Sequence, residues 1–191
     1  MRKMEYDVDK SPKWIKKDNV IKFCDDDFIR IVNFFVFHAP VENLSAKSKT
    51  IEEYGWNTPW KKPYYLNKQL KQSSSNMNLL YSASGYDRLP EALDKAGLLN
   101  DFPSDLSKER ASFYNTKKNQ FVSVFFHIWN AFAHGRFEIV DVNGESTFIF
   151  EDVAPKRGKN GKTNLSARMI LRKTTLLKWI NIIENGEKEY E

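Results

Sequence analysis

The chain has 191 residues, of which 41% are hydrophobic and 29% are charged, and it carries a formal net charge of +5. This length suffices for one domain with a sizeable core, and the single cysteine, Cys24, excludes an intrachain disulfide framework and a cysteine-rich zinc site. The mildly basic balance is compatible with a nucleic-acid partner but is weak evidence for one.

The sequence shows no signal-peptide core at its N-terminus and no apolar run long enough to span a bilayer. We therefore expect a cytoplasmic protein that does not enter a membrane. The single cysteine suits the reducing conditions of that compartment.

The N-terminal part of the chain is predicted to combine an arm, a helix and a loop. Residues 1–24 predict an irregular arm with basic residues between Lys10 and Lys17. Three consecutive aspartates, 25–27, favour the start of a helix in the apolar run that follows, which should end before Pro40. Residues 40–65 predict a loop, whose aromatic side chains either stack on bases or pack the loop onto the domain.

Three segments in the middle of the chain are predicted to be helical. Leu66–Leu80 and Pro90–Ala96 come first, and Gly97 follows the second of them as a C-cap. Ser107–His134 is the longest candidate, with Ser107 as an acceptable N-cap. These segments predict that most of the domain is helical.

The pattern changes to strands after Gly135. Two runs rich in β-formers, 137–142 and 146–150, flank the pair Asn143-Gly144. Asn-Gly between two such runs is a strong signal for a β-hairpin.

The end of the chain predicts a third strand and a last helix. Ala167–Leu171 has strand character, and Thr174–Glu184 has the apolar spacing of an amphipathic helix. We expect a β element over 137–171 and a closing helix over 174–186. Residues 1–191 then form a single, mainly α-helical domain with a small β element.

The apolar segment 121–137 carries the clearest chemical signal. His127, Asn130 and His134 are spaced i, i+3 and i+7, so they share one face of a helix that Gly135 ends. Burying them is costly unless each finds a partner, so they are either satisfied in a core or line a reactive cleft. The two histidines lie roughly 10 Å apart along the helix axis, too far for one metal ion without a partner chain, and we expect no metal and no cofactor.

The sequence from Asn130 to Phe137, Asn-Ala-Phe-Ala-His-Gly-Arg-Phe, resembles the signature of the HEPN superfamily of α-helical, mostly ribonuclease domains. That motif is an Arg followed after several residues by a His, often with Asn after the Arg and Gly after the His. Asn130, His134 and Gly135 match it. The resemblance implies a mainly α, HEPN-like helical bundle with a small C-terminal β-hairpin or three-stranded β element.

The resemblance also implies an activity. Similar proteins are homodimeric, metal-independent endoribonucleases of toxin–antitoxin or antiphage defence systems, so RNA and a cognate antitoxin are the implied partners. His134 would act as general acid or base in a dimeric cleft, Asn130 would orient the site, and His127 would assist. The side chains expected to hold backbone phosphates are Arg136, Lys156, Arg157, Lys159 and Lys162. The alternative for the basic residues 156–162 is a solvated loop.

The chain departs from the motif at the position of the Arg. Asn130 sets the register, and the preceding residue is Trp129, which has one donor and no charge. Three interpretations stay open: a natural inactive relative, replacement of the Arg by His127 or Arg136, or an inactivating substitution of a toxic enzyme.

Two functions other than catalysis also stay open. One is a non-catalytic, HEPN-like RNA-binding or regulatory dimer, which the missing Arg favours. The other is a purely structural helical dimer in which the polar residues of the 121–137 segment satisfy one another across an interface.

Overall fold

The computed structural model describes residues 14–15, 25–56, 63–76, 78–117, 119–154 and 164–185. Within these stretches lie five α-helices, three short helical turns and five strands. In chain order they are α1 (Asp26–Asn33), η2 (Phe34–His38), η3 (Glu52–Tyr54), α2 (Pro63–Ser73), β1 (Leu80–Ala83), η4 (Tyr86–Arg88), α3 (Leu89–Lys95), β2 (Arg110–Tyr114), α4 (Gln120–Ala133), β3 (Phe137–Val142), β4 (Glu145–Ala154), β5 (Asn164–Arg172) and α5 (Lys173–Asn185). The predicted arm, apart from Trp14 and Ile15, and the basic residues 156–162 lie outside the described part of the chain.

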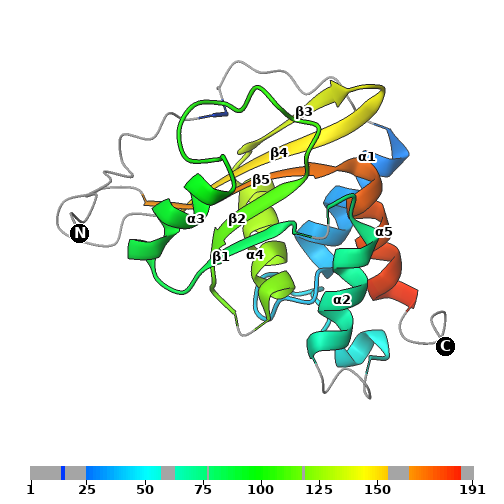
Figure 1. Cartoon of the computed structure of the whole chain (residues 1–191). Coiled ribbons are helices and arrows are strands. Elements are labelled where there is room, and N and C mark those ends of the chain that lie inside the picture. The colour runs from blue at the N-terminus through cyan, green and yellow to red at the C-terminus, as the bar shows by residue number, and fades with distance from the viewer. Residues whose placement is uncertain are drawn as a thin grey trace.

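The five strands form one mixed sheet in the order β1-β2-β5-β4-β3 (Figure 1). β1 and β2 are parallel and are joined through α3, whereas all other neighbours are antiparallel. Asn143 and Gly144 join β3 to β4 with positive φ angles of 57° and 82°. A two-residue hairpin turn needs positive φ at both positions, and Asn-Gly adopts it at low cost.

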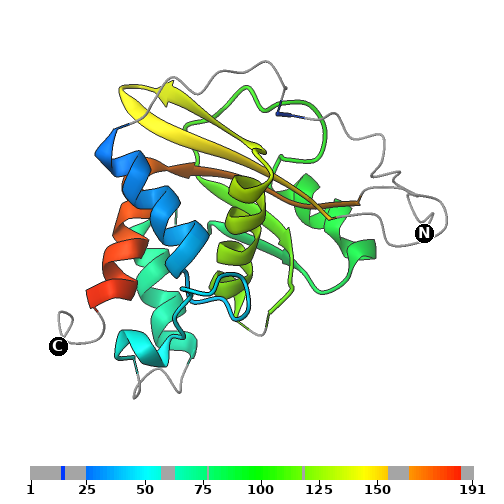
Figure 2. The same cartoon turned by 180° about the vertical axis from the view of Figure 1, so that it is seen from behind.

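Helices cover both faces of this sheet. α3 packs on one face, while α1, α2, α4 and α5 gather on the other, as the two opposite views show (Figures 1 and 2). Each face has its own hydrophobic cluster, and the larger one, under the four helices, contains most of the buried aromatic side chains. The described part of the chain is therefore a three-layer α/β arrangement.

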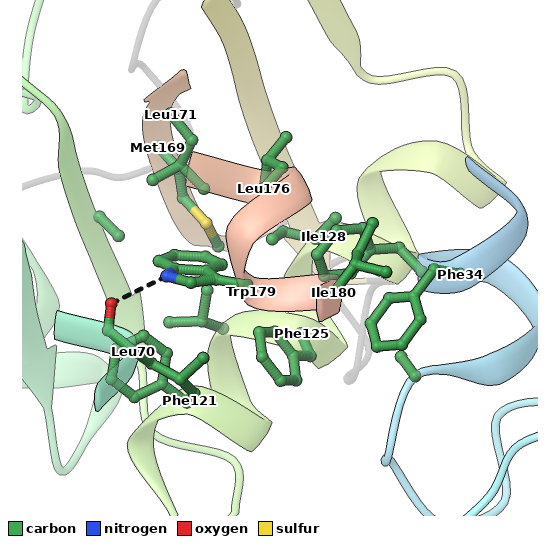
Figure 3. Close-up of a cluster of buried hydrophobic side chains, with 14 of the residues drawn as sticks. Phe34, Leu70, Phe121, Phe125, Ile128, Met169, Leu171, Leu176, Trp179 and Ile180 are labelled. Carbon is green, nitrogen blue, oxygen red and sulfur yellow. Dashed lines mark hydrogen bonds between the residues drawn. The ribbon is translucent and has the colours of Figure 1, made fainter. Parts of the chain in front are cut away.

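The larger cluster centres on Trp179 of α5, which has no exposed surface. Its indole Nε1–H donates to the carbonyl oxygen of Leu70 at 2.9 Å, and its ring meets Phe121 edge to face at 5.3 Å between centroids. Figure 3 shows this indole among side chains from α2, α4, α5 and β5. Full burial of a large apolar side chain contributes about 1.5–3 kcal/mol, so these contacts hold α2, α4 and α5 together.

The predicted fold class is wrong. The chain is not a mainly α-helical bundle with a small C-terminal β element, because a five-stranded mixed sheet runs through its centre. β1 begins at the last residue of the predicted helix Leu66–Leu80, and β2 lies inside the predicted helix Ser107–His134. These strands have four and five residues, too few for side-chain periodicity to separate strand from helix. The pairing of β2 with the distant β5, and of β1 with β2, decides their conformation.

The start of the central helix also differs from the prediction. Ser107 caps no helix; its backbone N–H and hydroxyl donate to Asp105 in a turn. α4 begins at Gln120, where the Asn119 side chain accepts from the Phe121 N–H at 2.8 Å. The C-terminal end is as predicted, since Gly135 follows α4 with a φ of 62°.

The other predicted elements of the C-terminal third are confirmed. The hairpin is β3 and β4, the third strand is β5, and the closing helix is α5. Upstream, the helix after the aspartates is α1, where Asp25 Oδ1 accepts from the Phe28 N–H at 2.8 Å. In the aromatic loop, Trp56 is buried and donates to Ile183, so this side chain packs onto the domain.

Candidate functional site

The middle of α4 holds a buried polar cluster around His127, whose ring has no exposed surface. The ring Nε2–H donates to the Tyr114 carbonyl oxygen at 2.7 Å, and Nδ1 lies 2.6 Å from Asp152 Oδ2. Asn130, one turn further along α4, donates from Nδ2 to the same carboxylate oxygen at 3.2 Å. This common partner confirms that His127 and Asn130 share one helix face.

The hydrogen-bond pattern indicates the charge state of this pair. A carbonyl oxygen only accepts, so the hydrogen that faces Tyr114 is on Nε2 of His127. The contact at Nδ1 then requires a second proton between the ring and Asp152. Because Asp152 Oδ2 accepts two further hydrogen bonds, from Asn130 and Ser166, we assign it as a carboxylate and His127 as an imidazolium. The extra donors help to offset the desolvation of this buried ion pair.

An irregularity in the pairing of β4 and β5 brings the third donor to the carboxylate. Asp152 pairs with Ala167 and Val153 pairs with Leu165, so Ser166 is an extra residue on β5. Such a bulge locally changes the direction of side chains. The Ser166 hydroxyl lies 2.8 Å from Asp152 Oδ2 and 3.1 Å from the backbone oxygen of the same residue.

A second buried ion pair lies on the opposite face of the sheet. Glu151 precedes Asp152 on β4, and successive side chains of a strand point to opposite faces. The Glu151 carboxylate lies 3.1 Å from Nη2 of the buried Arg168 and also accepts from the Trp14 N–H. Arg168 lies over the Trp14 ring and donates to two carbonyl oxygens of the segment after α3, at 2.9 and 2.8 Å. This pair therefore links the sheet to the α3 layer.

Sequence reasoning missed the partners of both clusters. The residues concerned are Tyr114, Glu151, Asp152, Ser166 and Arg168. The sequence signal that could have found these residues is the pair of adjacent acids, Glu151 and Asp152, at the end of a run rich in β-formers. Alternation places one acid on each face of a sheet, and a buried acid requires a partner.

His134 lies at the end of α4 and is exposed, in contrast to His127. Its backbone N–H closes the helix by donating to Asn130 O at 3.0 Å. Within the described residues its imidazole has no hydrogen bond and no ion pair. Arg136 follows shortly and is half-buried, with its carbonyl oxygen accepting from the Glu151 N–H. The structure thus separates the three predicted catalytic residues into a buried pair and one accessible imidazole.

Trp129 contacts a different part of the molecule. Its indole Nε1–H donates to the Val36 carbonyl oxygen of η2 at 3.2 Å. Position 129 therefore faces η2, whereas Asn130 faces β4. Of the proposed replacements for the motif Arg, His127 has no exposed surface with which to contact RNA, and Arg136 lies on the segment after the helix.

Positive charge is unevenly distributed along the chain. Acidic side chains slightly outnumber basic ones among the described residues, although the whole chain carries +5. The positive excess lies in the other segments, where Lys156, Arg157, Lys159 and Lys162 are the densest group. This group is joined to the end of β4 and the start of β5, the strands whose bulge contacts α4. The predicted phosphate contacts of these four residues lie outside the described part of the chain.

Two hollows of about 430 and 510 Å³ lie beside the helical layer, and none of the predicted site residues lines either. Tyr54 lines the first hollow. Burial raises the pKa of the Tyr54 hydroxyl to about 12, and the negative charges of Glu184 and Glu53 add smaller contributions. The Tyr54 hydroxyl therefore stays protonated at neutral pH and donates to His38 O at 2.7 Å. It serves to fix the loop rather than to accept a proton.

Family models, curated proteins and solved structures were all compared with this chain, and none matches it. No helix in the described ranges has both the length and the apolar character needed to cross a bilayer. The same residues contain no group of three or more His, Cys, Asp or Glu side chains placed to hold a metal ion. Assignment of a function therefore depends on the local geometry.

Proposed function

We propose that the chain is an RNA-binding protein that contacts the phosphate backbone at the end of the molecule where α4 finishes. The observation that carries the proposal is the position of His134, which is exposed beside Arg136 at that end. Asp152 of β4 contacts the middle of the same helix, and the basic residues 156–162 follow β4 in the sequence, outside the described part of the chain. Clustered Lys and Arg side chains supply the sequence-independent part of RNA affinity.

The likeness of residues 130–137 to the HEPN motif supports RNA as the ligand, but the observed geometry favours binding over cleavage. The motif Arg is absent, and the residue at its position, Trp129, faces η2. His127 is locked in the buried ion pair. Cleavage through a ribose 2′-OH needs a base, an acid and stabilisation of the phosphate charge, and one exposed His per chain supplies only one of the proton-transfer groups.

A second candidate function is metal-independent RNA cleavage by a homodimer. The accessible imidazole of His134 favours it, because an imidazole can serve either as general base or as general acid. A dimer in which the two His134 side chains share one cleft would supply both an acid and a base.

The experiment is binding of a labelled, mixed-sequence single-stranded RNA at several salt concentrations. We expect affinity that falls with salt and a weaker salt dependence when Lys156, Arg157, Lys159 and Lys162 are all changed to Ala. Each lost phosphate contact should lower the logarithmic slope by about 0.7. The matched control is Lys68→Ala with Lys71→Ala on α2, which also removes positive charge but lies on the helical layer. Equal loss in both variants, or no binding at all, would contradict the proposal.

Cleavage is measured on the same RNA in EDTA, with His134→Ala beside His38→Ala as the matched loss of another imidazole. A function limited to binding predicts intact RNA with all proteins. Cleavage that His134→Ala abolishes and His38→Ala preserves would establish the second candidate, and light scattering would then test whether the active species is a dimer.

A further inference from the structure

A polar hollow of about 330 Å³ opens where the parallel strands β1 and β2 end. Its polar lining consists of Ser82, Ser84, Arg88, Glu91, Lys95 and Asn115, with Tyr81 beside them. The volume lies in the range of about 300–1,000 Å³ that is typical of small-molecule sites. In sheets with helical crossovers, ligands bind outside the carboxyl ends of parallel strands, which is the location of this hollow.

A pair of stacked tyrosines lies close in the fold to residues that line the hollow, since Tyr114 pairs with the lining residue Ala83 in the sheet. The rings of Tyr86 and Tyr114 lie 4.1 Å apart between centroids and 22° from parallel. Tyr86 is 41% exposed. It precedes the lining residue Arg88 by two positions, and Tyr114 directly precedes the lining residue Asn115. The stack is therefore a pre-ordered, partly exposed aromatic surface in the neighbourhood of the hollow.

The charges in the hollow favour an anion. Two cations, Arg88 and Lys95, face one carboxylate, that of Glu91. Glu91 and Lys95 form an ion pair at 2.7 Å, and the hydrogen bond and charge of Lys95, followed by the charge of Arg88, hold the pKa of Glu91 below its usual value. Among the described residues, the Arg88 guanidinium has no ion pair of its own. Its donors are thus available for a ligand that carries two or more oxygens, such as a phosphate.

Two polar side chains that line the hollow are held in place by α4. Ser82 Oγ accepts from Gln120 Nε2 at 2.9 Å, and Asn115 Oδ1 accepts from the Ser123 hydroxyl at 2.9 Å. The Asn115 amide therefore has a fixed orientation that leaves its Nδ2 hydrogens as donors. Such pre-oriented polar groups confer specificity on a mostly preformed site.

We propose that this hollow binds a nucleotide, with the phosphate against Arg88 and Lys95 and the base stacked on Tyr86. The combination of a cationic cavity and a nearby exposed aromatic ring matches the two chemical halves of a nucleotide. The site lies on the α3 side of the sheet, whereas His127 and Asn130 lie on the α4 side. It goes beyond the RNA surface proposed above and does not depend on it.

The experiment is calorimetric titration of the full chain with adenosine 5′-monophosphate, adenosine and inorganic phosphate. We expect the nucleotide to bind more tightly than either part alone. Arg88→Ala should weaken binding of the nucleotide about tenfold and leave adenosine unchanged, because it removes charge-assisted hydrogen bonds to the phosphate. Glu91→Gln should tighten binding of the nucleotide, because it removes the one carboxylate of the hollow.

The aromatic half is tested with Tyr86→Ala, which should weaken binding of the nucleotide and of adenosine about tenfold. Tyr86→Phe is the matched control and should preserve both affinities, since it keeps the ring. Circular dichroism verifies the fold of each variant. Failure of the nucleotide to bind at millimolar concentration, or binding that neither Arg88→Ala nor Tyr86→Ala weakens, would overturn the proposal.

A competition between adenosine 5′-monophosphate and a single-stranded RNA distinguishes a free nucleotide from a nucleotide within an RNA chain as the ligand. Displacement of the RNA assigns the hollow to a nucleotide of a chain, and simultaneous binding assigns it to a free nucleotide. The substitutions at 156–162 separate the two proposals, because they should weaken RNA binding without changing the titration by the monophosphate.

Discussion

The middle of α4 and its C-terminal end carry the same side chain in opposite environments. His127 is fully buried, its two ring nitrogens bonded to Tyr114 and Asp152, whereas His134 is exposed at the helix end. Their spacing of seven residues predicts one shared helix face in an almost wholly apolar segment. The difference teaches that position along a helix, relative to where the sheet covers it, decides whether a histidine is buried in the core or exposed at the surface.

The contrast between the two histidines is tested most strongly by removing one member of the buried His127–Asp152 pair. Asp152→Ala leaves an imidazolium without its counter-charge, and His127→Ala leaves a buried carboxylate. We expect each to lower the free energy of unfolding by about 3–5 kcal/mol. Urea unfolding followed by circular dichroism measures the loss. A change below 1 kcal/mol in both variants would contradict the ionised assignment.

A substitution of Asn130 tests the edge of the same polar cluster around His127 and Asp152. Asn130→Ala removes one of three hydrogen bonds to Asp152 Oδ2 at a half-buried position. A hydrogen bond to a charged group contributes about 1.5–3 kcal/mol, so we expect a loss near the lower value. In a double-mutant cycle with Ser166→Ala, the two losses should not be additive because the donors share one oxygen. Strict additivity would show that the two donors act independently.

Substitutions of Gly135 test the backbone conformation that follows the end of α4. Its φ of 62° is costly for residues with a side chain, while the space around its Cβ position is open. Gly135→Ala should therefore lower the stability by about 1–2 kcal/mol through backbone strain alone. Gly135→Asn should cost less, because Asn tolerates this conformation. Thermal unfolding of the two variants makes the comparison, and equal losses would argue against strain as the cause.

His134 should give the smallest effect on stability. An exposed side chain without partners in the described structure contributes little, so His134→Ala should change the free energy of unfolding by less than about 0.5 kcal/mol. The loss in the free energy of unfolding for His134→Ala is then compared with the loss for His127→Ala. A loss of several kcal/mol at position 134 would show that the ring is held by contacts outside the described residues.

The C-terminal third could be predicted because its signals are local. The Asn143-Gly144 turn, the spacing of apolar residues in α5 and the left-handed Gly135 each depend on a few neighbouring residues. The sheet could not be predicted in the same way. β1 and β2 are short, and their conformation depends on pairing with each other and with β5, whose paired residues lie more than fifty positions after their partners in β2.

The polar face of α4 shows the same division. The spacing of His127, Asn130 and His134 predicts that they share a face, and the first two meet the same carboxylate. Which of them is buried depends on the bulge that brings Asp152 and Ser166 to the helix. No spacing within the 121–137 segment contains that information.

By itself, the sequence determined the helix after Asp25, the hairpin, the final strand and helix, and the one segment in which polar residues interrupt an apolar face, because dihedral preferences and periodicity act over short distances. Only the tertiary structure decided that the chain is an α/β protein, that His127 is an ion-paired core residue and that Arg88 and Asn115 line one hollow at the ends of β1 and β2. These features join segments far apart in the chain, and long-range pairing and desolvation decide them.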